Sequence, residues 1–226
     1  MKVSVIIPAY NEAKYLGKVL RSLNSQTVSP DEIIVVDNNS TDKTVDIAKS
    51  FGAKVVSEKK QGITPARDRG FDSSRFEIIA RCDADTIVPK EWIERIKVNF
   101  ADSKIDALSG PVIYYDARYL NTSTLPSRFY FKALSLLTGK KLLVGMNMIL
   151  TREIWEKVRK IVTTDDSKVH EDVDLSLKIA KVGGVIGYDN QLVVKASSRR
   201  IIHKPKSFFL EYPLRLLKTF WVNGGL

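Results

Sequence analysis

The first hundred residues alternate short apolar runs with stretches whose apolar positions recur every three or four residues. The apolar runs are rich in β-branched residues, as is typical of buried strands, and they cover residues 3–7, 33–36, 53–56 and 76–80. The stretches between them have helical spacing, shown by Leu16, Val19, Leu20 and Leu23. This alternation predicts right-handed βαβ units, and therefore an α/β fold with a mostly parallel central sheet flanked by helices.

The second half of the chain has a less regular pattern. It predicts strands over 107–115 and 142–150 and helices over 127–138, 151–160 and 171–182. From Pro205 onward the chain predicts an amphipathic, basic helix that is interrupted at Pro213. We therefore expect one domain over residues 1–204, divided near residue 115, and a helical segment over residues 205–226.

The composition supports a globular domain. The chain has 226 residues, of which 44% are hydrophobic and 27% are charged, which excludes a disordered chain, a fibrous repeat and a disulfide scaffold. No apolar run approaches the roughly 18 residues that suggest a transmembrane helix. The single cysteine, Cys82, is interpreted as a small buried hydrophobic residue and fits a reducing compartment, so we expect a cytoplasmic location.

The net charge of +10 first suggests a polyanionic partner such as nucleic acid, an anionic membrane or a phosphorylated ligand. The excess is confined to two segments: residues 116–141 carry +4 and residues 195–226 carry +6, whereas the remainder is close to neutral. Both basic segments also contain apolar residues, namely Phe129, Tyr130, Phe131, Leu136 and Leu137 in the first and Phe208, Phe209, Leu210, Phe220 and Trp221 in the second. They predict either a peripheral dock on an anionic membrane or core-packed helices with solvated lysines.

Polar clusters follow three of the predicted strands: Tyr10-Asn11-Glu12, Asp37-Asn38 and Asp83-Ala84-Asp85. In an open parallel sheet, ligands bind beyond the carboxyl ends of the strands. We therefore expect these three clusters to converge on one crevice.

Two acidic groups are candidates for the chemistry. Asp83 and Asp85 could place one carboxylate on Mg²⁺ or Mn²⁺ and the other on a sugar or ribose hydroxyl, or they could form a solvated turn. Glu171 and Asp172 begin a predicted helix, where the helix dipole already favours acids. Either carboxylate could take a proton from an attacking hydroxyl if the helix start faces the crevice.

Two basic residues remain open at this level. Arg67 could contact a phosphate or form a surface ion pair with Asp68 or Glu58. His203 could supply a metal ligand or contact a phosphate, or it could be structural. The chain lacks the glycine-rich signatures of dinucleotide-binding and P-loop proteins and the nucleophile elbow of α/β-hydrolases.

Taken together, the ordered motifs resemble glycosyltransferase family 2, whose members have the GT-A fold. The match runs from residue 3 to about residue 185 and rests on Val3–Glu12, Ile34–Asp42, Asp83–Asp85 and Glu171–Asp172. The resemblance implies an inverting enzyme that transfers a sugar from a nucleotide-diphosphate sugar to a glycan or lipid-linked hydroxyl acceptor. It implies that residues 1–115 bind the donor and that residues 116–204 hold the acceptor and the catalytic base.

The resemblance also implies roles for single residues. Donor-binding residues would be Pro8, Ala9, Tyr10 and Glu12 beside the nucleoside, Asp37 and Asn38 at the base, Arg67 near the nucleotide and Asp83 at the ribose or sugar. Asp85 would hold Mn²⁺ or Mg²⁺ on the diphosphate, with His203 as a further candidate ligand. Asp172, paired with Glu171, would be the catalytic base, and Gly145, Met146 and Asn147 would shape the donor-sugar and acceptor pocket.

The sequence departs from the family pattern at two places. Asn38 stands where many members have a second aspartate, so UDP is favoured by family habit while GDP and dTDP stay open. The Q-x-x-R-W motif of processive members is missing, which favours transfer of a single sugar. A polyprenyl-phosphate sugar synthase is an alternative, although such relatives generally lack the Glu-Asp pair. A nucleic-acid-binding protein is a further alternative, but the acidic crevice would repel phosphates unless a metal were bound.

Overall fold

The computed structural model describes residues 1–102, 104–117, 123–199 and 211–224. Its main sheet has seven strands in the order β3-β2-β1-β4-β7-β5-β8: Lys54–Ser57, Glu32–Asp37, Val3–Ala9, Ile78–Arg81, Met148–Thr151, Ala107–Ser109 and Ile186–Tyr188. Neighbouring strands are parallel except where β7 pairs with β4 and β5. The predicted α/β fold with a mostly parallel sheet is confirmed.

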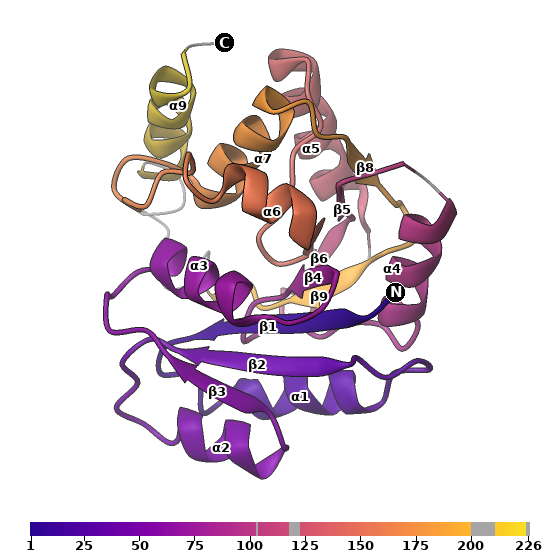
Figure 1. The fold of residues 1–226 in the computed structure, drawn as a ribbon, viewed down its shortest axis with the longest axis vertical. Helices are drawn as coiled ribbons and strands as arrows, with labels where there is room; N and C mark the ends of the chain where they lie inside the picture. The colour runs from indigo at the N-terminus through magenta and orange to yellow at the C-terminus, as the bar shows by residue number, and fades with distance from the viewer. Residues whose placement is uncertain (103, 118–122, 200–210, 225–226) are drawn as a thin grey trace.

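Helices cover both faces of this sheet because successive residues of a buried strand point to opposite sides. In β1, Val5 and Ile7 pack with α1 (Leu16–Asn24), α2 (Thr44–Ser50) and α4 (Trp92–Asp102), whereas Ile6 packs with α3 (Ile63–Ser73), α6 (Arg152–Val158) and α7 (Glu171–Lys181). Figure 1 shows α1 and α2 on one side of β1–β3 and α3 on the other. The apolar β1 run therefore supplies both layers of the core.

A third apolar cluster joins three helices of the second half. It contains Leu134 of α5 (Leu125–Thr138), Val173 and Leu177 of α7, and Phe220 of α9 (Tyr212–Val222). Figure 1 accordingly draws α7 between α5 and α9. Pro213 lies in the first turn of α9, where its missing N–H costs no hydrogen bond, so α9 continues past it. The predicted interruption of a longer helix at Pro213 stays a prediction. Residues 205–210 lie outside the described residues, and the division into segments 1–204 and 205–226 stays a prediction.

Both long strands predicted in the second half are wrong in extent. The first is broken at Gly110-Pro111 into β5 and β6 (Val112–Tyr114), and β6 pairs in parallel with β9 (Val194–Ala196) in a separate two-stranded sheet. A Cβ at position 110 would come 2.9 Å from the carbonyl oxygen of Asp189, so the backbone passes too closely there for any other residue. The second strand begins only at Met148.

The segment before β7 stays out of the sheet because side chains take its backbone N–H groups. The Leu143 N–H donates to Ser176 Oγ at 2.8 Å, the Val144 N–H donates to Ser109 Oγ at 3.1 Å, and the Gly145 N–H donates to Asp172 Oδ2 at 3.2 Å. Residues 142–147 therefore form a loop that connects the sheet to the first turn of α7.

Candidate active site

One pocket of about 430 Å³ opens at the carboxyl ends of β1, β2 and β4. The end of β1, the turn after β4, the start of α3, the loop 145–146, the start of α7 and the first turn of α9 contribute to its lining. Eleven residues selected from the sequence line it: Pro8, Ala9, Tyr10, Glu12, Asn38, Asp83, Asp85, Gly145, Met146, Glu171 and Asp172. Each of the three polar strand ends thus contributes to one crevice, as expected, although Asn11 and Asp37 are not among the lining residues.

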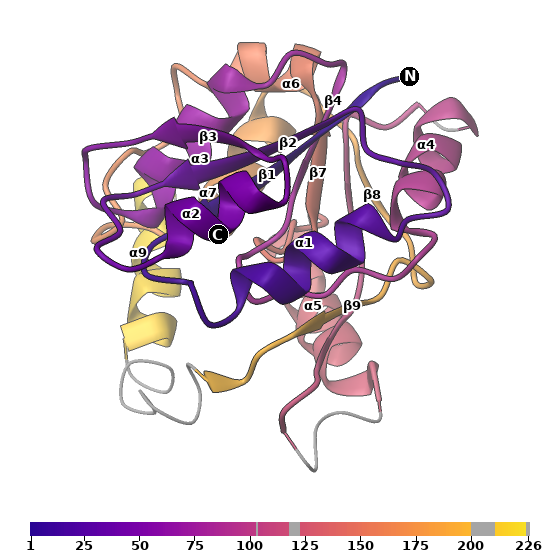
Figure 2. The same cartoon turned by 90° about the horizontal axis from the view of Figure 1, so that it is seen from below.

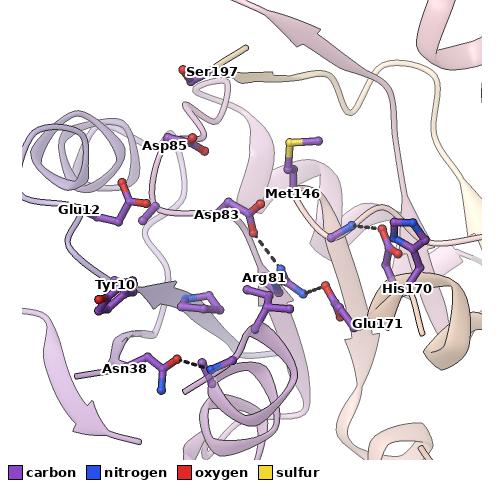
Figure 3. Close-up of a pocket in the computed structure, with 18 of the residues that line it drawn as sticks. Tyr10, Glu12, Asn38, Arg81, Asp83, Asp85, Met146, His170, Glu171 and Ser197 are labelled. Carbon is purple, nitrogen blue, oxygen red and sulfur yellow. Dashed lines mark hydrogen bonds and ion pairs between the residues drawn. The ribbon is translucent and has the colours of Figure 1, made fainter. Parts of the chain in front are cut away.

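Three carboxylates lie on one side of this pocket, as Figure 3 shows for Glu12, Asp83 and Asp85. Burial and the neighbouring charge of Asp83 raise the pKa of Asp85 to about 6, although the Arg199 guanidinium acts in the opposite direction. Arg199 Nε lies 2.8 Å from Asp85 Oδ2, and the same guanidinium also pairs with Glu12 Oε1. Glu12 Oε2 is buried and has no hydrogen-bond partner among the described residues.

A buried ion network lies under the other side of the pocket. Arg81 pairs with Asp83 at 2.9 Å and with Glu171 Oε1, and Arg67 pairs with Glu171 Oε2 at 2.7 Å. Burial alone would raise the pKa of Glu171, but Arg81 and Arg67 outweigh it and lower that pKa. Glu171 is therefore held as a carboxylate whose two oxygens are both engaged.

Asp172 has a different environment, although it is the next residue. Burial and the charge of Glu171 raise the pKa of Asp172, against the opposing effects of His170 and of the Gly145 N–H. Its oxygens accept hydrogen bonds from the backbone N–H groups of Gly145 at 3.2 Å and Val173 at 2.9 Å, and its carboxylate has no ion-pair partner among the described residues. These contacts fix the carboxyl group at the pocket and leave it able to accept a proton.

The start of α7 is tied to α9. The His170 N–H donates to Thr219 Oγ1 at 2.7 Å, and His170 Nε2 lies 2.9 Å from the carbonyl oxygen of Tyr212. Tyr212 and Arg215 line the pocket from this side. Helix α9 therefore closes one wall of the site and positions the first turn of α7.

Asn38 and Asp37 have distinct positions. Asn38 Nδ2 donates to the carbonyl oxygens of Glu58 and Lys60, both at 2.8 Å, and Asn38 Oδ1 accepts from the Gly62 N–H at 2.8 Å. The Asn38 amide thus holds the loop over the pocket by donating two hydrogen bonds and accepting one. An ionised carboxylate at this position could only accept. Asp37 does not line the pocket, and its Oδ1 accepts from the Ser40 N–H at 3.1 Å.

Three other predicted site residues lie elsewhere. Arg67 is fully buried behind Glu171 and pairs with Asp68 at 2.7 Å. The expected ion pair with Asp68 therefore forms, but it lies inside the protein and not at its surface. Asn147 is also fully buried: its Oδ1 accepts from Trp92 Nε1 at 3.0 Å and its Nδ2 donates to the carbonyl oxygen of Leu192 at 2.7 Å, which removes it from the expected pocket. His203 lies outside the described residues.

Sequence reasoning did not select Arg81 or Arg199 as site residues. A signal for Arg81 was present, because a charged residue at the end of a buried strand must find a charged partner. Arg199 had no such signal, since its partners Glu12 and Asp85 are far away in the sequence.

On the carboxylate side of the pocket, the protein supplies only some of the ligands that Mg²⁺ or Mn²⁺ would need. Among the described residues, no cluster of three or more His, Cys, Asp and Glu side chains is placed to hold a metal. Asp85 and the unpartnered Glu12 Oε2 offer hard oxygen ligands. Such ions are commonly held by one or two carboxylates together with substrate phosphates, so these residues fit a metal that arrives with a diphosphate.

Comparisons with known proteins agree with this geometry. The family model described as glycosyl transferase family 2 matches residues 4–159. The glycosyltransferase AglE of Haloferax volcanii is 35% identical over 135 residues, which cover 56% of this chain and 43% of that protein. The cholesterol galactosyltransferase of Borreliella burgdorferi is 25% identical over 248 residues, with 91% of this chain and 64% of that protein covered. The chain thus spans less than two thirds of these relatives.

Solved structures share the fold. The mannosyltransferase PcManGT from Pyrobaculum calidifontis, in complex with GDP-Man and Mn²⁺, superposes with a TM-score of 0.77 at 22% identity, covering 98% of this chain and 63% of that one. S. aureus TarS 1–349 with UDP-GlcNAc gives 0.70 at 23% identity, covering 88% and 59%. These likenesses identify the mixed sheet as the GT-A fold. Since the family model covers well over half of the chain, the chain belongs to glycosyl transferase family 2.

Proposed function

We propose that the chain is an inverting, metal-dependent glycosyltransferase that moves one sugar from a nucleotide-diphosphate sugar to a hydroxyl acceptor. The contrast between Glu171 and Asp172 carries this proposal. Glu171 is locked between two arginines, whereas Asp172 faces the pocket with a raised pKa and without an ion-pair partner among the described residues. The pocket therefore offers one carboxylate as a base, next to Glu171, which Figure 3 shows on the opposite side from Glu12 and Asp85.

The donor would lie along the carboxylate side. Pro8, Ala9, Tyr10 and Asn38 border the nucleoside, and Asp83 receives a ribose or sugar hydroxyl while Arg81 holds its carboxylate. Asp85, with Glu12, holds Mn²⁺ or Mg²⁺. When bound, the metal neutralises the charge that develops on the departing diphosphate. The bound GDP-Man, Mn²⁺ and UDP-GlcNAc of the two structural neighbours support a nucleotide sugar as donor, with UDP, GDP or dTDP as the nucleotide.

Asp172 would take the proton of the acceptor hydroxyl while the hydroxyl attacks the anomeric carbon. A single displacement with one base inverts that carbon, whereas retention through a covalent intermediate requires a second, nucleophilic carboxylate. Glu171 is unsuited to that second role because Arg67 and Arg81 bind both of its oxygens. Glu171 is thus a positioning residue for the first turn of α7.

The test is sugar transfer by Asp172→Asn and Asp85→Ala, with Asp165→Asn as the control, since Asp165 is a half-exposed carboxyl on the loop before α7 that is not among the residues lining the pocket. Removing the base should lower turnover by about 10²–10⁴-fold without loss of folding. Near-normal turnover by Asp172→Asn would contradict the base assignment. Near-normal turnover by Asp172→Asn would instead favour the alternative reaction, transfer to a polyprenyl phosphate. The phosphate oxygen of that acceptor is already ionised and needs no base.

We also propose that the acceptor side docks on an anionic membrane through α5 and α9. The exposed apolar residues of each helix recur at helical spacing: Leu125, Phe129 and Leu136 are 68–76% exposed, and Leu214, Leu217 and Trp221 are 60–82% exposed. Neither helix contains an acidic residue, and Arg128, Lys132, Arg215 and Lys218 supply positive charge. Figures 1 and 2 both place the two helices toward the same end of the molecule.

This combination of basic and apolar side chains favours an anionic bilayer over a second copy of the chain, because two such basic faces would repel each other. Phe220 is instead buried in the core, and residues 208–210 and the side chains of Tyr130, Phe131 and Leu137 lie outside the described structure. Among the described helices, none is both long and apolar enough to cross a bilayer. The interaction is therefore proposed as peripheral, at the cytoplasmic face that the single cysteine led us to expect.

Co-sedimentation with vesicles of anionic or neutral lipid tests the docking. The protein should bind the anionic vesicles at low salt and dissociate at high salt, with a blue shift of tryptophan fluorescence from Trp221. A double substitution, Leu214→Asp with Leu217→Asp, should abolish binding. Val98→Asp, at an apolar position of α4 that is 53% exposed, serves as the control. Failure to bind anionic vesicles at low salt, or self-association through the same residues, would contradict the proposal.

A further inference from the structure

Arg199 occupies the acidic side of the pocket. Its Nε lies 2.8 Å from Asp85 Oδ2, its Nη2 pairs with Glu12, and its guanidinium carbon lies 4.4 Å from the centroid of the Tyr15 ring. One planar cation thereby bridges two carboxylates that come from the ends of different strands. The side chains of Glu12 and Asp85 are only 14% and 13% exposed, so water alone would screen their mutual repulsion poorly.

The backbone around Arg199 is anchored rather than loose. Asp116 accepts hydrogen bonds from the Ser197 hydroxyl and from the Ser198 N–H, the latter at 2.6 Å. The Arg199 N–H donates to Ser197 Oγ at 3.2 Å. Because these bonds fix the base of the side chain and Tyr15 stacks on its end, the guanidinium is held at the two carboxylates.

We infer that Arg199 is a tethered counter-ion that a divalent metal must displace from Asp85, so that the metal enters with the diphosphate rather than alone. This inference rests on the proposed role of Asp85 as the metal carboxylate. A divalent ion on Asp85 would face a guanidinium already bonded to the same carboxyl group, and the two like charges repel. An incoming diphosphate supplies the negative charge that allows metal and arginine to be present together.

Binding of Mn²⁺ alone, measured by electron paramagnetic resonance without nucleotide, tests the inference directly. Arg199→Ala should bind Mn²⁺ about tenfold more tightly than the wild type, since removing an adjacent positive charge favours the cation by about this amount. Arg199→Lys should fall between the two, because an ammonium lacks the planar fork needed to bridge both carboxylates. Arg95→Ala, which breaks a similarly exposed Arg–Asp pair with Asp189, should leave Mn²⁺ affinity unchanged.

Asp85→Ala separates this inference from the proposed function. If Asp85→Ala still binds Mn²⁺, the proposed metal site is wrong. If Asp85→Ala loses Mn²⁺ but Arg199→Ala binds it no more tightly than wild type, the site stands and the counter-ion role is overturned. Circular dichroism checks that each variant is folded. As a second measurement that needs no alanine variant, the Arg199 Nε–Hε NMR signal, identified by its loss in Arg199→Lys, should shift more when Mg²⁺ and UDP are added together than when either is added alone. A signal that shifts fully with Mg²⁺ alone, or that Mg²⁺ does not change further in the presence of UDP, would also overturn the inference.

Discussion

Glu171 and Asp172 are neighbours in the sequence with opposite electrostatic environments. The two arginines lower the pKa of Glu171, whereas burial and the charge of Glu171 raise the pKa of Asp172. A helix start rich in acids predicts only that both residues are tolerated there. Their division into one positioning residue and one candidate base depends on Arg67 and Arg81, which come from distant segments.

The raised pKa of Asp172 predicts the acidic limb of the pH profile. A base must be ionised, so kcat/KM should fall as the pH is lowered through the Asp172 pKa, which lies above the ordinary 3.8 of an aspartate. Initial rates between pH 4 and pH 8, at fixed saturating metal, measure this limb. A rate that stays constant down to pH 4 would contradict Asp172 as the base.

Gly145 is expected to be sensitive to the addition of one methyl group. A Cβ there would lie 3.1 Å from Glu171 Oε1 and 3.2 Å from Arg81 Nη2, so the ion pair next to Asp172 would have to move by tenths of an ångström. Gly145→Ala should therefore lower kcat about tenfold with a small change in melting temperature, because catalysis tolerates misplacement less than folding does. Equal kcat in the two proteins would show that the pair can adjust.

At the scale of elements, α3 lies unusually close to the sheet at Gly70. A Cβ on Gly70 would overlap Ile6 and come 2.9 Å from Val36 Cγ2, both of which are buried strand residues. Gly70→Ala should lower the free energy of unfolding by about 1–3 kcal/mol, as overpacking does. Gly17→Ala is the matched control: its nearest contact is 3.6 Å, so it should instead stabilise by about 0.4–1 kcal/mol. Urea unfolding measures both, and equal destabilisation would contradict the packing argument.

Elements were predictable from sequence where each buries a regular face. The apolar runs of β1 and β2 and the spacing in α1 give their positions within a few residues. In the second half, the helices α5, α6 and α7 were predicted within a few residues. The segment before β7 was not, because its backbone hydrogen bonds go to side chains such as Ser109, Ser176 and Asp172, which no apolar pattern encodes. The strands β8 and β9, each of three residues, are too short to show a period.

At the scale of the whole molecule, both halves of the chain meet at the pocket. A ligand that binds only the folded protein should stabilise it by mass action, by about 2.7 kcal/mol at a hundredfold excess over Kd. The melting temperature should rise accordingly. Thermal unfolding with UDP, GDP or dTDP in the presence of Mn²⁺ should single out one nucleotide. Mn²⁺ alone and Asp85→Ala are the controls, and no shift with any nucleotide would contradict a nucleotide-sugar donor.

The net charge also changes meaning at this scale. The total of +10 alone predicts nothing about fold, but the excess lies in the two segments that contain α5 and α9. The sequence could predict this segregation. It could not predict that α9 would also line the pocket with Arg215, because this depends on the contacts of Thr219 and Tyr212 with His170.

The reversed direction of β7 has a consequence for how such a protein can diversify. Ser109 at the end of β5 and Met148 at the start of β7 are register partners, so the chain leaves the sheet and returns to it at adjacent positions. Residues 110–147 therefore form an excursion whose ends are fixed by the sheet. Lengthening it beyond β6, which must keep its pairing with β9, costs little closure entropy and moves no strand of the seven-stranded sheet. The fold thus permits one part of the acceptor side to be remodelled as a cassette while the donor edge keeps its geometry.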